Sequence, residues 1–321
     1  AEMEFRTLSK RLSEKLGVEA PTIAEPEVQQ AAIEAPAAVA FDASKYETIR
    51  DTVVLQAWID RIYARGYVAV DTETTGLNEM RADLVGVSLC VEAGEAAYLP
   101  LTHRAGQSDD LFGTDALAEG QMDLDTALAM LKPMLEDSTI LKIGQNMKYD
   151  AKILARVGIQ VAPIDDTMLM SYAQNGGLHN HGMDLLSERY LDHAPISIKT
   201  LLGSGKSAIT FDRVPIDEAS LYAAEDADIT LRLWQYLKPR LHLNRVTAVY
   251  ESLERPLVPV LADMEMQGIK VDRDVLSRMS NGFAQKMAGL EAEIHEIAGR
   301  SFNVGSPKQL GEVLFDELAL P

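Results

Sequence analysis

The chain has 321 residues, of which 47% are hydrophobic and 25% are charged, and this composition is typical of a soluble globular protein. The formal net charge of −19 argues against a broad basic surface for nucleic acids, unless the acidic side chains hold divalent cations that reverse the local charge. No run approaches the roughly 18 apolar residues of a membrane span, and the first residues lack the pattern of a signal peptide, so a cytoplasmic location is expected.

The first 45 residues predict a helix followed by a linker. Phe5, Leu8 and Leu12 recur at helical spacing within residues 3–16, so an amphipathic helix is expected there. Residues 18–45 are rich in alanine, proline and glutamate and have little periodicity. This composition indicates an extended linker.

The next part of the chain predicts strands first and helices afterwards. Alternating apolar residues predict strands in YVAV, in both halves of ADLVGVSLCVEAGEAAYLPL around the turn EAGE, and in TILKIG. This order is typical of a mixed sheet covered by helices. Helical periodicity predicts helices over residues 50–64, 125–137, 146–158, 166–174, 183–190 and 217–240.

Residues 244–321 differ in character from what precedes them. The sequence YESLERPLVPVLADMEMQGIKVD predicts a helix that breaks near Pro256 and Pro259 and ends in a turn at Gly268. A long amphipathic helix is expected next, and SPKQLGEVLFDEL predicts another helical unit. We expect this region to be the beginning of a further domain.

Two residues are expected to have structural roles. Asp166 precedes a predicted helix and is expected to cap it. Cys90 is the single cysteine of the chain, so it has no partner for an internal disulfide, and its strand-like surroundings predict a buried hydrophobic side chain.

The sequence DTETTGL places two acids at the end of a predicted strand. Asp71 and Glu73 lie two residues apart, so their side chains project to the same side of the strand. Two close negative charges raise a pKa and destabilise the fold unless a cation lies between them. An isolated Asp-x-Glu can instead cap the turn that follows, and the pair alone leaves both interpretations open.

Further acids occur at the starts and faces of predicted helices. Asp150 lies in the first turn of a helix after a buried strand, where helix capping alone could explain it. Tyr222 and Asp226 lie four residues apart on one helical face. Their neighbours Glu225 and Asp228 are expected to be solvated.

Taken in chain order, these residues form D-x-E, N-x-x-x-D and Y-x-x-x-D, which resemble the three motifs of the tyrosine-containing branch of the four-carboxylate 3′-to-5′ exonucleases. The sequences VDTETTGLN, KIGQNMKYDAKIL, DDTMLMSY, SAITF and YAAEDADITLRL resemble the proofreading domain of the bacterial family A DNA polymerases, the DNA polymerase I family. The sequences ERPLVPVLADMEMQGIKVD and SPKQLGEVLFDEL are similar to the entry of that family's polymerase domain, and MEFRTLSKRL resembles the last helix of its 5′-nuclease domain.

The resemblance implies an α/β fold and a division into domains. Residues 46–243 would form the 3′-to-5′ exonuclease domain, with a ribonuclease H-like mixed sheet flanked by helices. Residues 1–17 would end a preceding 5′-nuclease domain, and residues 18–45 would be the linker. Residues 244–321 would begin the polymerase domain at the base of its thumb, so polymerase activity is not expected from this segment.

The resemblance also implies a mechanism, namely hydrolysis of phosphodiester bonds with two divalent ions, Mg²⁺ or Mn²⁺, about 3.5–4 Å apart. Asp71, Glu73 and Asp226 would hold the first ion, and Asp71 and Asp150 the second. Tyr222 would orient the attacking water. The expected activity is release of 5′-mononucleotides from single-stranded or frayed 3′ ends of DNA during replication and repair.

Other residues match family positions that hold the terminal nucleotides, although Leu77 could also belong to the core. Two positions depart from the family pattern. Ile198 stands where an aromatic residue packs against the terminal bases, and Asn180 stands where an arginine is frequent. Both departures bear on substrate affinity and leave the acids unchanged. The expected nucleotide-binding residues are Leu77, Gln145, Asn146 and Tyr149.

Two other functions are compatible with the same residues. A ribonuclease D-like RNA 3′ exonuclease would use the same tyrosine-type site, although a polymerase-like region at residues 244–321 is unexpected in such an enzyme. An inactive exonuclease fold could serve as a scaffold between polymerase modules. The presence of all four acids and of Tyr222 argues against the inactive form.

Overall fold

The computed structural model divides into two compact units, one ending at Met266 and the other beginning at Gln267. The helix expected within residues 3–16 and most of the linker expected at residues 18–45 lie outside the described residues. The domain boundary expected after residue 243 remains a prediction. The structure describes residues 15–16, 39–105, 116–205 and 208–320.

The first unit is built on a six-stranded mixed sheet with the order β1-β4-β3-β2-β5-β6. Strands β2, β3 and β4 form the predicted antiparallel meander. Strand β5 pairs parallel to β2, β6 parallel to β5, and β1 parallel to β4. The strands are β1 (Glu47–Thr48), β2 (Tyr67–Thr74), β3 (Leu84–Glu92), β4 (Glu95–Pro100), β5 (Leu141–Gly144) and β6 (Ile164–Asp166).

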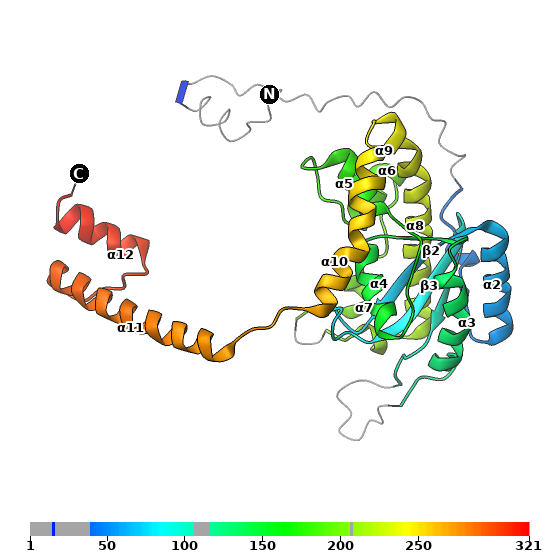
Figure 1. Ribbon diagram of the computed structural model, residues 1–321, viewed down its shortest axis with the longest axis horizontal. Helices are drawn as coiled ribbons and strands as arrows, with labels where there is room; N and C mark the ends of the chain where they lie inside the picture. Colours follow the sequence, from blue (N-terminus) through cyan, green and yellow to red (C-terminus); the bar gives the residue numbers. More distant parts are fainter. Residues whose placement is uncertain (1–14, 17–38, 106–115, 206–207, 321) are drawn as a thin grey trace. The chain divides into compact units, whose positions relative to one another are not determined.

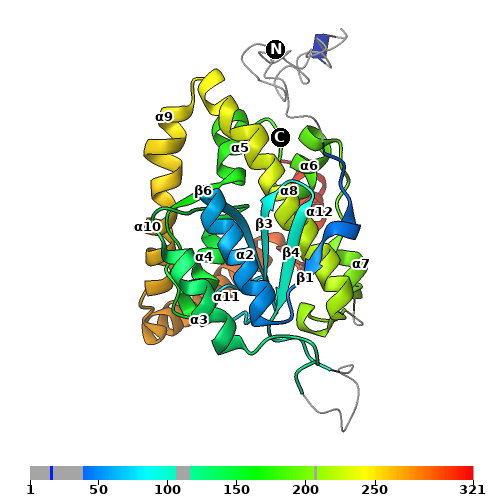
Figure 2. The same ribbon diagram turned by 90° about the vertical axis from the view of Figure 1, so that its right-hand side faces the viewer.

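Helices cover both faces of this sheet, which confirms the expected fold class (Figure 1). Val68 and Val70 of β2 pack into a core with α2, α3 and α4, while Ala69 packs against α8 on the opposite face (Figure 2). Side chains alternate along a strand, so Asp71 and Glu73 continue the face that α8 covers. The helices are α2 (Thr52–Arg65), α3 (Leu124–Glu136), α4 (Met147–Arg156), α5 (Thr167–Asn175), α6 (Met183–Leu191), α7 (Ile198–Leu202) and α8 (Ile216–Leu243).

Helix α8 contacts the sheet through small side chains. Ala224 and Ala227 are fully buried and pack against Ala69, Cys90 and Ile143 of the strands. Since alanine adds no more than a methyl group, the helix lies close to β2, β3 and β4. Cys90 is buried in this layer, as predicted.

Glu225 and Asp228 are buried on α8, so the expectation that they are solvated is wrong. Asp228 accepts hydrogen bonds from the Tyr46 hydroxyl and the Gly94 N–H, both at 2.9 Å. Glu225 accepts one from the Ile196 N–H at 2.6 Å. These partners come from segments far away in the sequence, and they satisfy acids that the helical pattern alone would leave in water.

The chain continues from α8 through α9 (Thr247–Val249) and the π-helical turn η4 (Tyr250–Glu254) into α10 (Arg255–Gln267). The break expected near Pro256 and Pro259 is absent from this described stretch, because α10 continues through Pro259. A wider π-helical turn directly before α10 accommodates the proline region without ending the helix.

The second unit contains the predicted long helix and the helical segment after it. Phe302 and Val313 are buried within this unit. Among the described residues, no helix combines the length and apolar character needed to cross a bilayer. The elements are α11 (Arg273–Ala298), α12 (Pro307–Gly311) and the π-helical turn η5 (Glu312–Glu317).

Candidate active site

One cavity of about 420 Å³ opens at the end of β2, between this strand, α4 and the N-terminal half of α8. It collects every residue that the sequence predicts for the site. The predicted residues in its lining are Asp71, Glu73, Leu77, Gln145, Asn146, Tyr149, Asp150, Tyr222 and Asp226.

Three carboxylates from β2 and α8 converge in this cavity. One oxygen each from Asp71, Glu73 and Asp226 lies within 4.8 Å of the others. Burial raises the pKa of Asp71 to about 7. Burial, followed by the charges of Asp71 and Asp226, raises the pKa of Glu73 well above its ordinary value. Burial and the charge of Asp71 raise the pKa of Asp226 in the same direction.

Asp150 reaches the same cavity from the first turn of α4. Its Oδ1 accepts hydrogen bonds from the N–H of Thr72 at 3.0 Å and from the Thr72 hydroxyl at 2.5 Å. Burial and the nearby charge of Asp71 raise the pKa of this carboxyl. The side chain is therefore tied to β2, a contact that helix capping alone does not explain.

The donor set fits a hard divalent cation. Oε1 of Glu73 is buried and has no hydrogen-bond partner among the described residues. An unpartnered carboxylate oxygen next to two further carboxylates is costly unless a cation neutralises the group. Oxygen ligands are those that Mg²⁺ and Mn²⁺ prefer.

Tyr222 stands one helical turn before Asp226 and is half-buried. Burial, together with the charge of Asp226, raises the pKa of the phenol above its ordinary value. The hydroxyl therefore stays protonated at neutral pH and can donate a hydrogen bond. The ring packs against Phe211, with the two centroids 5.9 Å apart.

The turn after β2 presents Leu77 to the cavity. This side chain is 94% exposed, so the expectation that it could belong to the core is wrong. Tyr149 of α4 holds the turn, because its hydroxyl donates to the Gly76 carbonyl at 2.6 Å and lies 2.5 Å from the Thr74 hydroxyl oxygen. Leu77 is thus an apolar side chain displayed on a fixed turn.

The turn between β5 and α4 supplies Gln145 and Asn146. The Gln145 amide donates to the carbonyl of His181 at 2.8 Å. Asn146 has a φ of 61°, in the left-handed region that asparagine tolerates better than most residues. Both residues are therefore held by the fold before any ligand is present.

The opposite wall of the cavity is apolar, and only part of it was predicted from the sequence. Ile198 lies in this wall, which places the residue that replaces the family's aromatic at the cavity. Asn180 is absent from the described lining and accepts a hydrogen bond from the Gly182 N–H at 2.7 Å instead. The SAITF sequence was the available signal for Ile209 and Phe211, whereas no motif pointed to Leu202. The wall consists of Ile198, Leu202, Ile209 and Phe211.

Comparison with known proteins gives consistent matches along the chain. Residues 46–242 match a family model described as 3′-5′ exonuclease, and residues 273–321 match one described as DNA polymerase family A. DNA polymerase I of Rhizobium leguminosarum is 52% identical over 303 residues, which are 92% of this chain and 30% of that protein. DNA polymerase I of Pseudomonas aeruginosa is 41% identical over 280 residues, 86% of this chain and 30% of that protein.

The chain therefore spans about a third of the length of these curated relatives. Among solved structures, the POL domain of Pol1 from M. smegmatis has a TM-score of 0.66 at 23% identity, over 86% of this chain and 41% of that one. Brucella melitensis NrnC has a TM-score of 0.50 at 23% identity, over 70% of this chain and 93% of that one. Both similarities concern the fold.

Proposed function

This chain belongs to DNA polymerase family A and carries that family's 3′-5′ exonuclease domain, and from this premise we propose that it removes 5′-mononucleotides from the 3′ ends of DNA. The reaction is phosphodiester hydrolysis with two divalent ions, Mg²⁺ or Mn²⁺. We also propose that it serves proofreading in DNA replication and repair, in the bacterial cytoplasm and beside the remaining domains of a full-length polymerase.

The cluster of Asp71, Glu73 and Asp226 carries this proposal, because its oxygens lie within 4.8 Å of one another and one of them lacks a hydrogen-bond partner among the described residues. These three residues would hold one ion, and Asp71 with Asp150 a second. When bound, the pair of ions lowers the pKa of a water and stabilises charge on the entering and leaving oxygens.

The side chains around the cluster would place the reacting groups. Tyr222 keeps its proton because its pKa is raised, so it donates a hydrogen bond and orients the attacking water instead of accepting its proton. Thr72 fixes the carboxylate of Asp150 by two hydrogen bonds. Most of the positioning is therefore present in the fold before substrate enters.

The terminal nucleotides would bind between the displayed turn and the apolar wall. Leu77 is exposed at the cavity and would insert beside the terminal base, while Gln145, Asn146 and Tyr149 would hold the sugar and phosphate. A base must leave its stack to reach this cavity, so single-stranded or frayed ends are the expected substrates.

Digestion of 3′-labelled strands tests this function. Equal lengths of DNA and RNA are incubated with the chain, with Mg²⁺ and with EDTA. The proposal expects Mg²⁺-dependent release of mononucleotides from DNA and slower release from RNA. Preferential digestion of RNA would support the ribonuclease D-like alternative, and failure to digest either strand with Mg²⁺ or Mn²⁺ would support the inactive scaffold.

A further inference from the structure

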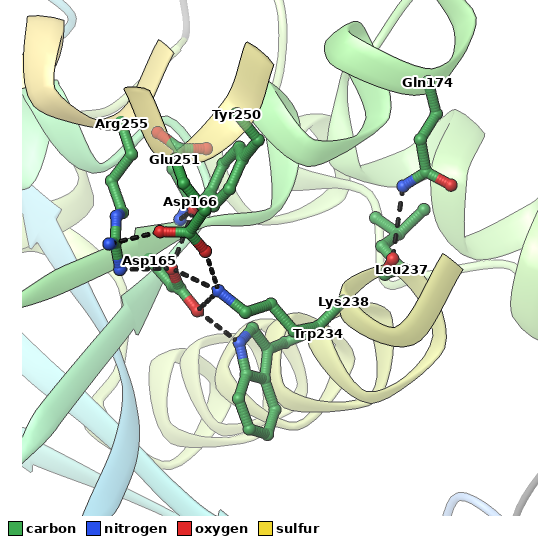
Figure 3. A network of polar contacts seen from close by, with 9 residues as sticks. All are labelled: Asp165, Asp166, Gln174, Trp234, Leu237, Lys238, Tyr250, Glu251 and Arg255. Atoms are coloured by element: carbon green, nitrogen blue, oxygen red, sulfur yellow. Dashed lines mark hydrogen bonds and ion pairs between the residues drawn. The ribbon is translucent and has the colours of Figure 1, made fainter. Parts of the chain in front are cut away.

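The segment after α8, residues 247–266, contacts the end of β6 and helices α4, α5 and α8, although it lies outside the residues matched by the exonuclease family model. Its anchor is Tyr250, which is fully buried. The Tyr250 hydroxyl donates to Oδ1 of Asp165 and accepts the N–H of Asp166, both at 2.9 Å (Figure 3). Segment 247–266 therefore holds both acids at the end of β6.

Asp165 is a buried carboxylate shared by several elements. It accepts the indole N–H of Trp234 at 2.8 Å and lies 2.9 Å from the ammonium of Lys238, both on α8. Arg255 of α10 adds a contact at 3.4 Å (Figure 3). These donors compensate the buried charge, so the end of β6 is a fixed point between α8 and segment 247–266.

Asp166 connects the end of β6 to α4. Its carboxylate accepts the N–H of Met147 at 2.8 Å and that of Asn146 at 3.2 Å, in addition to capping α5 as predicted. Asn146 makes no side-chain cap for α4, so Asp166 takes that place. A series of direct contacts thus runs from Tyr250 through Asp166 to the first residues of α4.

A second contact joins the same two elements further along. Glu265 of α10 accepts from Lys148 of α4 at 2.5 Å and from Lys152, one turn later. Lys152 is 1% exposed and also pairs with Glu79, in the turn that displays Leu77. Glu265 therefore holds the outer side of α4 and, through Lys152, the turn after β2.

Helix α4 carries Tyr149 and Asp150 into the cavity on its other side. We propose that Tyr250 and Glu265 are positioning residues that fix α4 from the side opposite the cavity, so that segment 247–266 contributes to the geometry of the exonuclease site. The effect on metal and substrate rests on the proposed function, whereas the effect on α4 itself does not.

The test uses the full chain with two conservative variants, Tyr250→Phe and Glu265→Gln, and their double variant. Two matched controls lose a comparable contact elsewhere. Tyr190→Phe removes a half-buried hydroxyl that accepts a hydrogen bond from Asn175. Glu317→Gln weakens the ion pair with Arg300 in the second unit. Hydrogen exchange of residues 145–153 is measured without metal, and binding of Mg²⁺ is measured by calorimetry.

In the double variant, we expect exchange in residues 145–153 to be faster and half-saturation with Mg²⁺ to need a higher concentration, each by about tenfold, while α2 exchanges as in the wild type. The controls should change neither quantity. Unchanged exchange and Mg²⁺ binding in a folded double variant would overturn the proposal, because segment 247–266 would then stabilise the fold without positioning α4. If the wild-type chain digests no DNA but α4 still exchanges faster in the double variant, the proposed function is contradicted and the positioning role is supported.

Discussion

Thr72 donates both its N–H and its hydroxyl to the same carboxylate oxygen of Asp150, so a residue of β2 orients an acid of α4. Replacement of Thr72 by valine keeps the shape of the side chain and removes one of the two bonds. We expect Thr72→Val to need more Mg²⁺ for half-maximal digestion, by about tenfold, as is typical when a partner of a metal ligand is lost. A titration of DNA digestion with Mg²⁺ measures this shift, and an unchanged midpoint would contradict the role of Asp150.

Asp71 is the acid shared by both expected metal positions. Asp71→Ala should lower Mg²⁺-dependent digestion of single-stranded DNA by at least about a hundredfold, because both ions lose a ligand. Circular dichroism should show an intact fold, because among the described residues Asp71 has no ion-pair partner that the substitution would leave unpaired. Digestion at the wild-type rate would refute the metal assignment.

Divalent cations should stabilise the folded chain. The four acids of the cavity repel one another, and a cation bound to the native state alone adds about 2.7 kcal/mol at a concentration a hundred times its Kd. We therefore expect Mg²⁺ to raise the Tm by several degrees and EDTA to reverse the rise. Asp226→Asn should reduce the shift in differential scanning fluorimetry, whereas an equal shift in this variant would place the cation elsewhere.

Leu77 allows binding to be separated from stability. Because the side chain is 94% exposed, Leu77→Ala should change the free energy of unfolding by less than about 0.5 kcal/mol. Loss of its contact with the terminal base should raise KM for single-stranded DNA by about tenfold, with a smaller effect on kcat. Steady-state kinetics and urea unfolding test the two halves of this prediction, and an unchanged KM would remove Leu77 from the substrate site.

His103 predicts a pH dependence of stability. It is 1% exposed, its Nδ1 donates to the Val214 carbonyl at 3.0 Å, and its Nε2 accepts from the Tyr98 hydroxyl at 2.8 Å. Burial lowers the pKa of His103 below its ordinary value, a decrease that the hydrogen bond to the Val214 carbonyl and the charge of Asp212 partly offset. The unfolded chain therefore binds a proton at His103 more readily, so the contribution of this residue to stability should decrease as the pH falls below about 6.5, while the cavity acids with raised pKa values change stability in the opposite direction.

The variant His103→Gln can still donate and accept but cannot titrate. It should be less stable than the wild type at pH 8, and the difference in free energy of unfolding between the two proteins should become smaller between pH 7 and pH 5. Urea unfolding at several pH values gives both slopes. Equal slopes in the two proteins would show that another group controls stability in this range.

Much of the fold follows from local periodicity. The apolar alternation of β2, β3 and β4 and the helical repeats of α2, α3 and α8 extend over enough residues to identify each element. Strands β1 and β6 have two and three residues, too few for a repeat, and their pairing depends on neighbours elsewhere in the chain.

The cavity was predictable for the residues with a characteristic spacing, such as Asp71 with Glu73 and Tyr222 with Asp226. Leu202 and Phe211 were missed because they lie in helical segments of five and three residues, which are too short for a repeat that tells an apolar residue lining a cavity from one filling a core. The buried state of Asp228 was missed because, besides Arg232 one turn along α8, the residues that satisfy it, Tyr46 and Gly94, are far away in the sequence.

The alanines of α8 have a consequence for ion size. Asp226 comes from the helix and Asp71 from the sheet, so the distance between their oxygens depends on how closely the two layers approach. That approach is set by the methyl groups of Ala224 and Ala227, which lie outside the cavity lining among the described residues. Mg²⁺ binds oxygens at about 2.0–2.1 Å and Ca²⁺ at about 2.3–2.6 Å. If the cavity binds a divalent cation as proposed, discrimination between these ions would therefore depend partly on the packing between helix and sheet, through residues that touch no ligand.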